Sequence, residues 1–149
     1  CFISHRNAVI FVTDIFKGID MPAFSNFLFG KVMQNPELCK ELIQRILPDL
    51  KIDHIEYPEL QKSIKQDMDA KSVRLDVYVK DGKEVVYDIE MQVSDTKELP
   101  KRSRYYQSMI DLQLIDKGQY YDELNRSDVI SVYFIKLLSF IVLLYTVPC

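Results

Sequence analysis

Residues 73–93, VRLDVYVKDGKEVVYDIEMQV, contain two apolar runs separated by Asp81-Gly82. Apolar side chains occupy every second position of each run: Val73, Leu75, Val77 and Val79, then Val85, Tyr87, Ile89, Met91 and Val93. Alternation with a period of two is typical of half-buried strands, and Asp-Gly between two such runs indicates a hairpin. The stretch therefore predicts two antiparallel strands joined by a tight turn.

Three polar residues interrupt this pattern. Asp76 lies in the first predicted strand, and Glu90 and Gln92 lie in the second, two residues apart and therefore on one face. Acidic residues are depleted in strands, and two carboxylates on one patch of sheet repel each other unless a cation or a proton lies between them. The pattern indicates a divalent-metal site; the alternative is the solvated outer face of an antiparallel hairpin.

The length of the hairpin loop decides whether the two acids meet. A two-residue loop would turn Glu90 to the face opposite Asp76. A three-residue loop at 81–83 would place Asp76 opposite Asp88, with Glu90 as its diagonal neighbour about 7–8 Å away. A metal site requires this longer loop or a bulge, and Gly82 can take the left-handed position that such loops use.

The remaining elements are predicted from apolar periodicity and from Pro and Gly positions. They are helices at 24–33, 35–47 and 100–118, strands at 52–57, 60–64 and 129–134, and a turn at 120–124. Asn35 and Pro36 supply an N-cap and a first-turn proline. The long helix is expected to turn inward Tyr106, Met109, Ile110, Gln113 and Leu114. This order predicts an α/β (α+β) domain with a mixed sheet flanked by helices.

One basic cluster has aromatic neighbours: Lys97, Lys101, Arg102, Arg104, Tyr105 and Tyr106. It lies at the start of the long predicted helix, directly after the strand that carries Glu90. Cationic side chains and a helix N-terminus beside a metal site would suit a DNA phosphate, which makes Lys101, Arg102 and Arg104 candidate nucleic-acid ligands. The alternative is an ordinary helix end of mixed charge, since Glu98 is adjacent.

Composition limits the function classes. A chain of 149 residues that is 48% apolar has room for one sizeable core. The net charge of −3 argues against a protein that binds DNA over its whole surface, so any DNA contact must come from a local patch. The three cysteines, Cys1, Cys39 and Cys149, form neither a zinc pattern nor a disulfide framework, which predicts a reducing, cytoplasmic location.

Five blocks follow one another along the chain: FLFGKVMQNPELCKELIQRIL (27–47), IEYPELQKSI (55–64), VRLDVYV (73–79), VYDIEMQ (86–92) and LPKRSRYYQSMIDLQLIDKG (99–118). With the pattern D-x(13)-E-x-Q, this series resembles the bacterial PD-(D/E)XK nuclease family transposases, also called recombination-promoting nucleases, over residues 24–128. The resemblance implies a restriction-endonuclease-like core at 24–134, with 1–23 and 135–149 as extensions outside the family pattern.

The resemblance also implies a chemistry. Asp76 and Glu90 would hold Mg²⁺ (or Mn²⁺) with the backbone carbonyl of Met91, and the site would hydrolyse DNA phosphodiester bonds. Gln92 replaces the usual Lys of the superfamily and completes the catalytic set of Asp76, Glu90 and Gln92. It can orient water or phosphate but supplies no charge; the alternative is an exposed polar residue of a strand. DNA is the expected partner, no small-molecule cofactor is expected, and a homodimer is left open.

Two further acids are weaker candidates. Asp88 shares the face of Glu90 and is a candidate third acid; the alternative is an outer hydrogen bond or a solvated side chain. Glu41 matches the helix acid that completes some sites of the superfamily; the alternative is a solvent-exposed residue of an amphipathic helix.

Several features depart from the family. Asn26 stands where the family commonly has Asp, the chain begins with Cys1, and residues 129–147 are strongly apolar around Lys136. These features lead us to expect a truncated or frameshifted member. The alternatives to a nuclease are a non-catalytic remnant with at most weak DNA binding and, less favoured because of Lys136, a membrane-tethered interaction protein.

Overall fold

The computed structural model describes residues 9–11, 26–56, 58–65, 69, 71–92, 97–133 and 141–143. The described strands form one sheet in the order β1-β6-β5-β4-β3-β2. They are β1 (Val9–Phe11), β2 (Glu59–Ile64), β3 (Val73–Lys80), β4 (Val86–Gln92), β5 (Ser127–Tyr133) and β6 (Ile141–Leu143). Strands β4 and β5 run parallel and the other described pairs run antiparallel, so the sheet is mixed.

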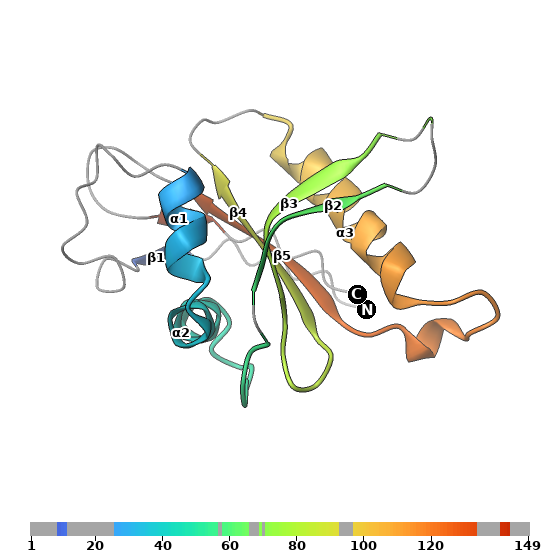
Figure 1. Cartoon of the computed structure of the whole chain (residues 1–149), viewed down its shortest axis with the longest axis horizontal. Helices are drawn as coiled ribbons and strands as arrows, with labels where there is room; N and C mark the ends of the chain where they lie inside the picture. The colour runs from blue at the N-terminus through green and yellow to red at the C-terminus, as the bar shows by residue number, and fades with distance from the viewer. Residues whose placement is uncertain are drawn as a thin grey trace.

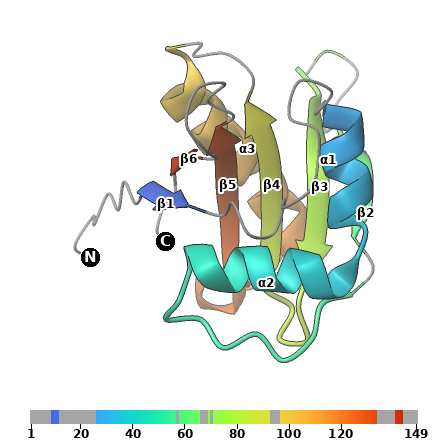
Figure 2. The same cartoon turned by 90° about the vertical axis from the view of Figure 1, so that its left-hand side faces the viewer.

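Helices lie on both faces of this sheet (Figure 1). Helices α1 (Asn26–Met33) and α2 (Pro36–Ile46) are on one face, and α3 (Leu99–Leu114) is on the other. Figure 2 shows α2 lying across the ends of β3, β4 and β5, with α1 beside β3. The predicted mixed sheet flanked by helices is confirmed.

Helix α2 starts where the sequence predicts. The Asn35 side chain accepts hydrogen bonds from the N–H groups of Glu37 and Leu38 at 3.0 and 3.3 Å, and Pro36 occupies the first turn. The helix buries Cys39, Leu42, Ile43 and Ile46. Burial raises the pKa of the Cys39 thiol to about 12, so this cysteine is a packing residue and not a reactive one.

The two faces of the sheet carry separate apolar cores. The core under α1 and α2 includes Val77, Val79, Tyr87, Ile89, Met91, Ile130 and Val132. The core under α3 includes Ile64, Val73, Leu75, Val86, Met109, Ile110 and Val129. Along β4, Tyr87, Ile89 and Met91 point to the core under α1 and α2. Because side chains alternate along a strand, Asp88, Glu90 and Gln92 point to the opposite face, toward α3.

Strand β3 changes face halfway along its length. Val73 and Leu75 pack under α3, whereas Val77 packs under α1 and α2, although a regular strand would turn all three to one side. The β2 residue at the change, Gln61, has a left-handed backbone with φ 53°. Described pairing between β3 and β4 begins only at Val77. The first half of β3 therefore leaves β4 and packs, together with β2, against α3 (Figure 1).

The hairpin loop has three residues, as expected, but starts one residue later than expected. Lys80 pairs with Val86, and the Asp81 N–H donates to the Val85 carbonyl at 3.0 Å, which leaves 82–84 as the loop. Glu84, and not Gly82, has the left-handed φ of 61°. A Cβ at Gly82 would lie 2.3 Å from Cε1 of His54, so a larger residue there would have to displace that exposed side chain. The prediction that Asp76 opposes Asp88 was therefore wrong by two residues.

Other predicted elements agree with the structure in part. The helix at 24–33, the strands at 60–64 and 129–134 and the turn at 120–124 are confirmed in their described residues as α1, β2, β5 and the 3₁₀ helix η2 (Tyr121–Glu123). The strand at 52–57 is wrong, because the described residues of that segment, 52–56, contribute a single bridge, Ile55 to Asp81. Helix α3 ends at Leu114 instead of Gly118, and Gln113 is exposed while Ser103 and Gln107 are buried.

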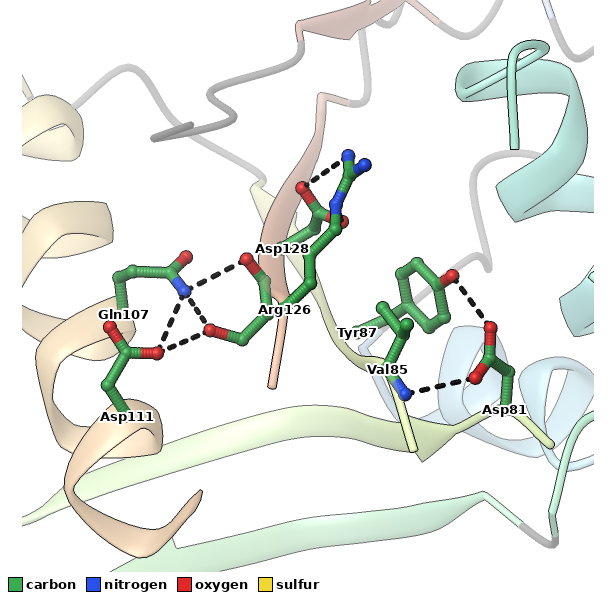
Figure 3. Close-up of polar contacts among 8 residues, drawn as sticks. Asp81, Val85, Tyr87, Gln107, Asp111, Arg126 and Asp128 are labelled. Atoms are coloured by element: carbon green, nitrogen blue, oxygen red, sulfur yellow. Dashed lines mark hydrogen bonds and ion pairs between the residues drawn. The ribbon is translucent and has the colours of Figure 1, made fainter. Parts of the chain in front are cut away.

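Polar contacts organise the end of the sheet farthest from the point where β3 and β4 separate (Figure 3). Asp81 accepts hydrogen bonds from the N–H groups of Lys83 and Val85, at 2.8 and 3.0 Å, and from the Tyr87 hydroxyl at 3.1 Å. These bonds fix the turn that sets the hairpin register.

A second polar group in the same view ties α3 to the start of β5. The Gln107 side chain donates to the Ser127 carbonyl at 2.9 Å, and the Ser127 hydroxyl donates to Asp111. Arg126 forms a bidentate pair with the buried Asp128, at 2.8 and 3.2 Å. The helix is thus anchored by side-chain hydrogen bonds as well as by apolar packing.

The expected extensions contribute backbone to the sheet edge. Strand β1 pairs with β6, and β6 pairs with β5 from Ser131 to Tyr133. The domain boundaries at 23/24 and 134/135 lie outside the described residues and stay a prediction. No helix within the described ranges is long and apolar enough to span a bilayer.

Tyr87→Phe should destabilise the fold by about 1–3 kcal/mol, because it leaves a buried carboxylate oxygen of Asp81 without its donor. Urea denaturation measures this difference in the free energy of unfolding. Tyr121→Phe is the matched control, since Tyr121 is 90% exposed, and it should change stability by less than about 0.5 kcal/mol. Equal stability of both variants would show that the Tyr87–Asp81 bond does not hold the turn.

Candidate active site

Asp76 and Glu90 face each other across β3 and β4. The described register of β3 and β4 ends with Val77 opposite Ile89, and Asp76 and Glu90 are the next residues of the two strands. The Asp76 N–H donates to Oε1 of Glu90 at 2.9 Å, and the Met91 N–H donates to Oδ2 of Asp76 at 3.1 Å. Each carboxylate therefore accepts a backbone N–H of the opposite strand at the point where the two strands separate.

This position is unfavourable for two negative charges. Glu90 is only 4% exposed, and burial, followed by the charge of Asp76, raises its pKa to about 7. Burial also raises the pKa of Asp76, although the Met91 N–H and the nearby Arg102 oppose that shift. A cation between the two carboxylates would relieve both effects.

Asp88 adds a third acid behind this pair. Asp88 is fully buried, and its side chain lies on the same face of β4 as that of Glu90. With both acids ionised, neither carboxylate oxygen of Asp88 has a hydrogen-bond donor among the described residues. Burial and then the charge of Glu90 raise its pKa well above the ordinary value, so a proton shared with Glu90 is the state that satisfies both groups.

Arg102 of α3 joins the acids to the basic cluster. Its guanidinium lies 3.6 Å from Oε2 of Glu90 and 5.5 Å from the centre of the Tyr106 ring. Because Glu90 is nearly buried, this pair is less screened by solvent than a surface ion pair. Arg102 therefore supplies the positive charge that partly compensates the acids.

Gln92 belongs to a buried polar patch under α3. It is 6% exposed, and Ser131 of β5 pairs in register with Glu90 on the same face. Within the described part of the chain, Nε2 of Gln92 and the hydroxyls of Ser103 and Ser131 have no hydrogen-bond partner, like the carboxylate of Asp88. Buried polar atoms left open in this way are the groups that ordered water or an ion satisfies.

A pocket of about 400 Å³ lies beside the acids, between the start of β3 and the first turns of α3. Lys101 and Arg102 line it, as do Lys71 and Tyr105, and the Tyr105 hydroxyl donates to the Lys71 carbonyl at 2.7 Å. Arg104 is exposed and is not among the described lining residues. The basic residues predicted from the sequence are thus brought together only in part.

Sequence reasoning missed Lys71, Ser103 and Ser131. Lys71 is 26 residues before Lys97 and reaches the same pocket only because β3 bends toward α3. Ser131 could have been found from the parallel pairing of β4 with β5, but that pairing is not visible in local sequence.

Glu41 and Asn26 are not brought to the acids by any described contact. Glu41 is exposed on α2, where it pairs with Arg45, and α2 is on the face of the sheet opposite α3. Asn26 begins α1, and its side chain lies outside what the structure describes.

The donor set suits a small, hard cation. No group of three or more His, Cys, Asp or Glu side chains in the described ranges is placed to hold a metal ion. Mg²⁺, however, retains several waters and uses one or two carboxylates, so Asp76, Glu90 and a backbone carbonyl are an adequate set of protein ligands. The repulsion between Asp76 and Glu90, and the buried polar atoms of Asp88 and Gln92 that lack partners among the described residues, are consistent with such a cation.

The raised pKa of Glu90 predicts how stability depends on pH in the metal-free protein. Folded Glu90 keeps its proton up to about pH 7, whereas the ordinary value is 4.5, so the folded state binds more protons in this interval. The free energy of unfolding should therefore fall as pH rises from about 4.5 to about 7. In EDTA, Glu90→Gln should raise the melting temperature at about pH 8 and gain little at about pH 5.

Glu41→Gln is the control for this measurement, because Glu41 is an exposed carboxylate. Melting curves of the three proteins at both pH values provide the comparison. If the melting temperatures of Glu90→Gln and the wild type changed equally between the two pH values, ionisation of buried Glu90 would not destabilise the fold.

The family model of the PD-(D/E)XK nuclease family transposases matches residues 23–143. No curated protein and no solved structure matches the chain. The mixed sheet with helices on both faces is consistent with the restriction-endonuclease-like fold expected for that family. Because the match covers most of its length, the chain belongs to the PD-(D/E)XK nuclease family transposases.

Proposed function

We propose that the chain is a metal-dependent DNA endonuclease of the recombination-promoting type, which hydrolyses phosphodiester bonds. Mg²⁺ or Mn²⁺ would be held by Asp76, Glu90 and the backbone carbonyl of Met91. The observation that carries the proposal is the opposition of Asp76 and Glu90 where β3 and β4 separate, with each carboxylate fixed by one backbone N–H. A family that suggests nuclease activity supports the same reading.

The bound cation would polarise the scissile phosphate and lower the pKa of the attacking water. The chain's own contribution begins with orientation. Because Oε1 of Glu90 and Oδ2 of Asp76 are held by backbone N–H groups, the carboxylates cannot rotate freely, and little reorganisation is needed when substrate binds.

Gln92 is proposed to orient a water or a phosphate oxygen. Its side chain follows Glu90 on the same face, and its Nε2 has no partner among the described residues, so that donor is available. A neutral amide contributes a hydrogen bond but no charge, which limits its effect on a transition state that gains negative charge.

Arg102 and Lys101 are proposed to bind the DNA backbone beside the acids. Arg102 is within 3.6 Å of Glu90, and both residues line the pocket next to it. Arg104 is exposed on α3 and is proposed as an outer phosphate contact. Asp88 is proposed to act through Glu90, as the buried group that shares its proton; a role for Glu41 has no support in its position.

A second candidate function is a non-catalytic member of the family that binds DNA weakly. The Arg102–Glu90 ion pair favours this candidate, because the guanidinium beside Oε2 of Glu90 can neutralise the acids in place of a metal ion. A cytoplasmic location and a homodimer stay predictions.

Asp76→Asn should abolish Mg²⁺-dependent nicking of supercoiled plasmid, and EDTA should do the same to the wild type. The substitution removes one of the two charged ligands, so the ion is bound more weakly and is no longer held between the two strands. Asp81→Asn is an unsuitable control because Asp81 holds the turn, so Glu41→Gln, on the opposite face, is used instead. If wild type and control are inert with both Mg²⁺ and Mn²⁺, the non-catalytic reading replaces the enzyme.

Gln92→Ala should slow cleavage by about two- to thirteenfold, which corresponds to one neutral hydrogen bond of roughly 0.5–1.5 kcal/mol. Gln92→Lys should retain or raise activity, since an ammonium group there is compensated by the neighbouring acids and stabilises charge on the phosphate. Single-turnover rates of the three proteins make the comparison. A folded but inactive Gln92→Lys protein would restrict position 92 to a neutral, orienting role.

A further inference from the structure

The pocket beside the acids has features that a contact with paired DNA does not require. Its volume of about 400 Å³ falls in the range of small-molecule sites, about 300–1,000 Å³. Val73 at the start of β3 and the two residues before it, Lys71 and Ser72, supply one wall, and α3 with the residues before it supplies the other. The pocket exists because the first half of β3 leaves β4 and approaches α3.

The charge of the lining favours an anion. Among the described lining residues, four side chains are cationic, Lys71, Lys97, Lys101 and Arg102, and one is a carboxylate, Glu98. Arg102 is shared with Glu90, so the other three cations are available to a phosphate group. These cations would hold a phosphate in the pocket, and Arg102 connects the pocket with Glu90 of the proposed cleavage site.

Aromatic surface is the second feature. The Tyr105 hydroxyl donates to the Lys71 carbonyl at 2.7 Å, so the side chain bridges the two walls. Tyr105 is nevertheless 38% exposed, and with its hydroxyl engaged the ring provides an apolar surface in the pocket. The adjacent Tyr106 ring has Arg102 above it at 5.5 Å. The pocket thus offers a flat ring beside cations.

We propose that this pocket binds one unpaired nucleotide of the DNA substrate, with its phosphate at Lys97 and Lys101 and its base stacked on Tyr105. A base in a duplex is stacked between its neighbours and cannot use a ring inside a pocket, whereas unpaired bases stack on aromatic side chains next to a basic groove. The inference rests on the proposed action on DNA, and it directs that action to DNA with single-stranded or extruded nucleotides.

The test measures binding without cleavage. Isothermal titration in EDTA follows the binding of deoxyadenosine monophosphate to the full chain and to Tyr105→Leu, Tyr105→Phe and Tyr121→Leu. Loss of the ring in Tyr105→Leu should weaken binding at least about fivefold, the lower end of one stacking interaction. Tyr105→Phe keeps the ring and should stay close to wild type, as should Tyr121→Leu, which changes an exposed tyrosine outside the pocket.

A second measurement uses a short duplex with and without one unpaired adenosine. The wild type should prefer the duplex with the unpaired base, and Tyr105→Leu should lose that preference. Lys101→Gln should weaken both complexes and reduce the salt dependence, because one phosphate contact is removed.

Two results would overturn the inference: no binding of the nucleotide at millimolar concentration, or equal binding by the wild type and Tyr105→Leu. Equal binding would show that the pocket contacts only the phosphate and does not stack the base on Tyr105. Because these measurements contain no divalent metal, nucleotide binding by a protein that fails the nicking assay would reject the proposed cleavage and support the pocket. Cleavage of DNA with and without unpaired bases at the same rate would support the proposed cleavage and reject the nucleotide pocket.

Discussion

Two hydrogen bonds from backbone N–H groups to carboxylates hold β3 and β4 together where their regular pairing stops. When strands separate, their backbone groups need other partners, and Glu90 and Asp76 provide acceptors for Asp76 and Met91. The same bonds orient both acids. Beyond them, β3 is free to pack Val73 and Leu75 against α3, which creates the pocket. The site and the shape of the sheet therefore have one origin.

This arrangement makes the site costly to the folded chain. Asp88, Glu90 and Gln92 occupy positions where apolar residues would pack α3 more favourably, and several of their polar atoms lack partners within the described residues. Packing elsewhere, in the two apolar cores and in the Asp81 and Gln107 contacts, must offset that cost. A local violation of the packing rules inside an otherwise consistent fold is what a functional site produces.

The hairpin, the mixed sheet and the common face of Glu90 and Gln92 could be predicted because they follow from period-two alternation and from local turn residues. The register could not, because Glu84 takes the left-handed conformation that the sequence assigned to Gly82. Gln107 is buried in place of Gln113 because its amide reaches Ser127, a partner 20 residues away. Lys71 joins the basic pocket through the bend in β3, which no local pattern encodes.

The length of the three-residue loop at 82–84 sets the register of β3 and β4, and this register brings Asp76 and Glu90 together at the far end of the hairpin. A strand's side chains alternate between faces, so inserting or deleting one residue in the loop would move Glu90 away from its place opposite Asp76 and turn apolar residues of β4 toward the wrong core. Substitutions at exposed loop positions such as Lys83 leave that count unchanged. Evolution can thus vary the composition of this turn far more freely than its length.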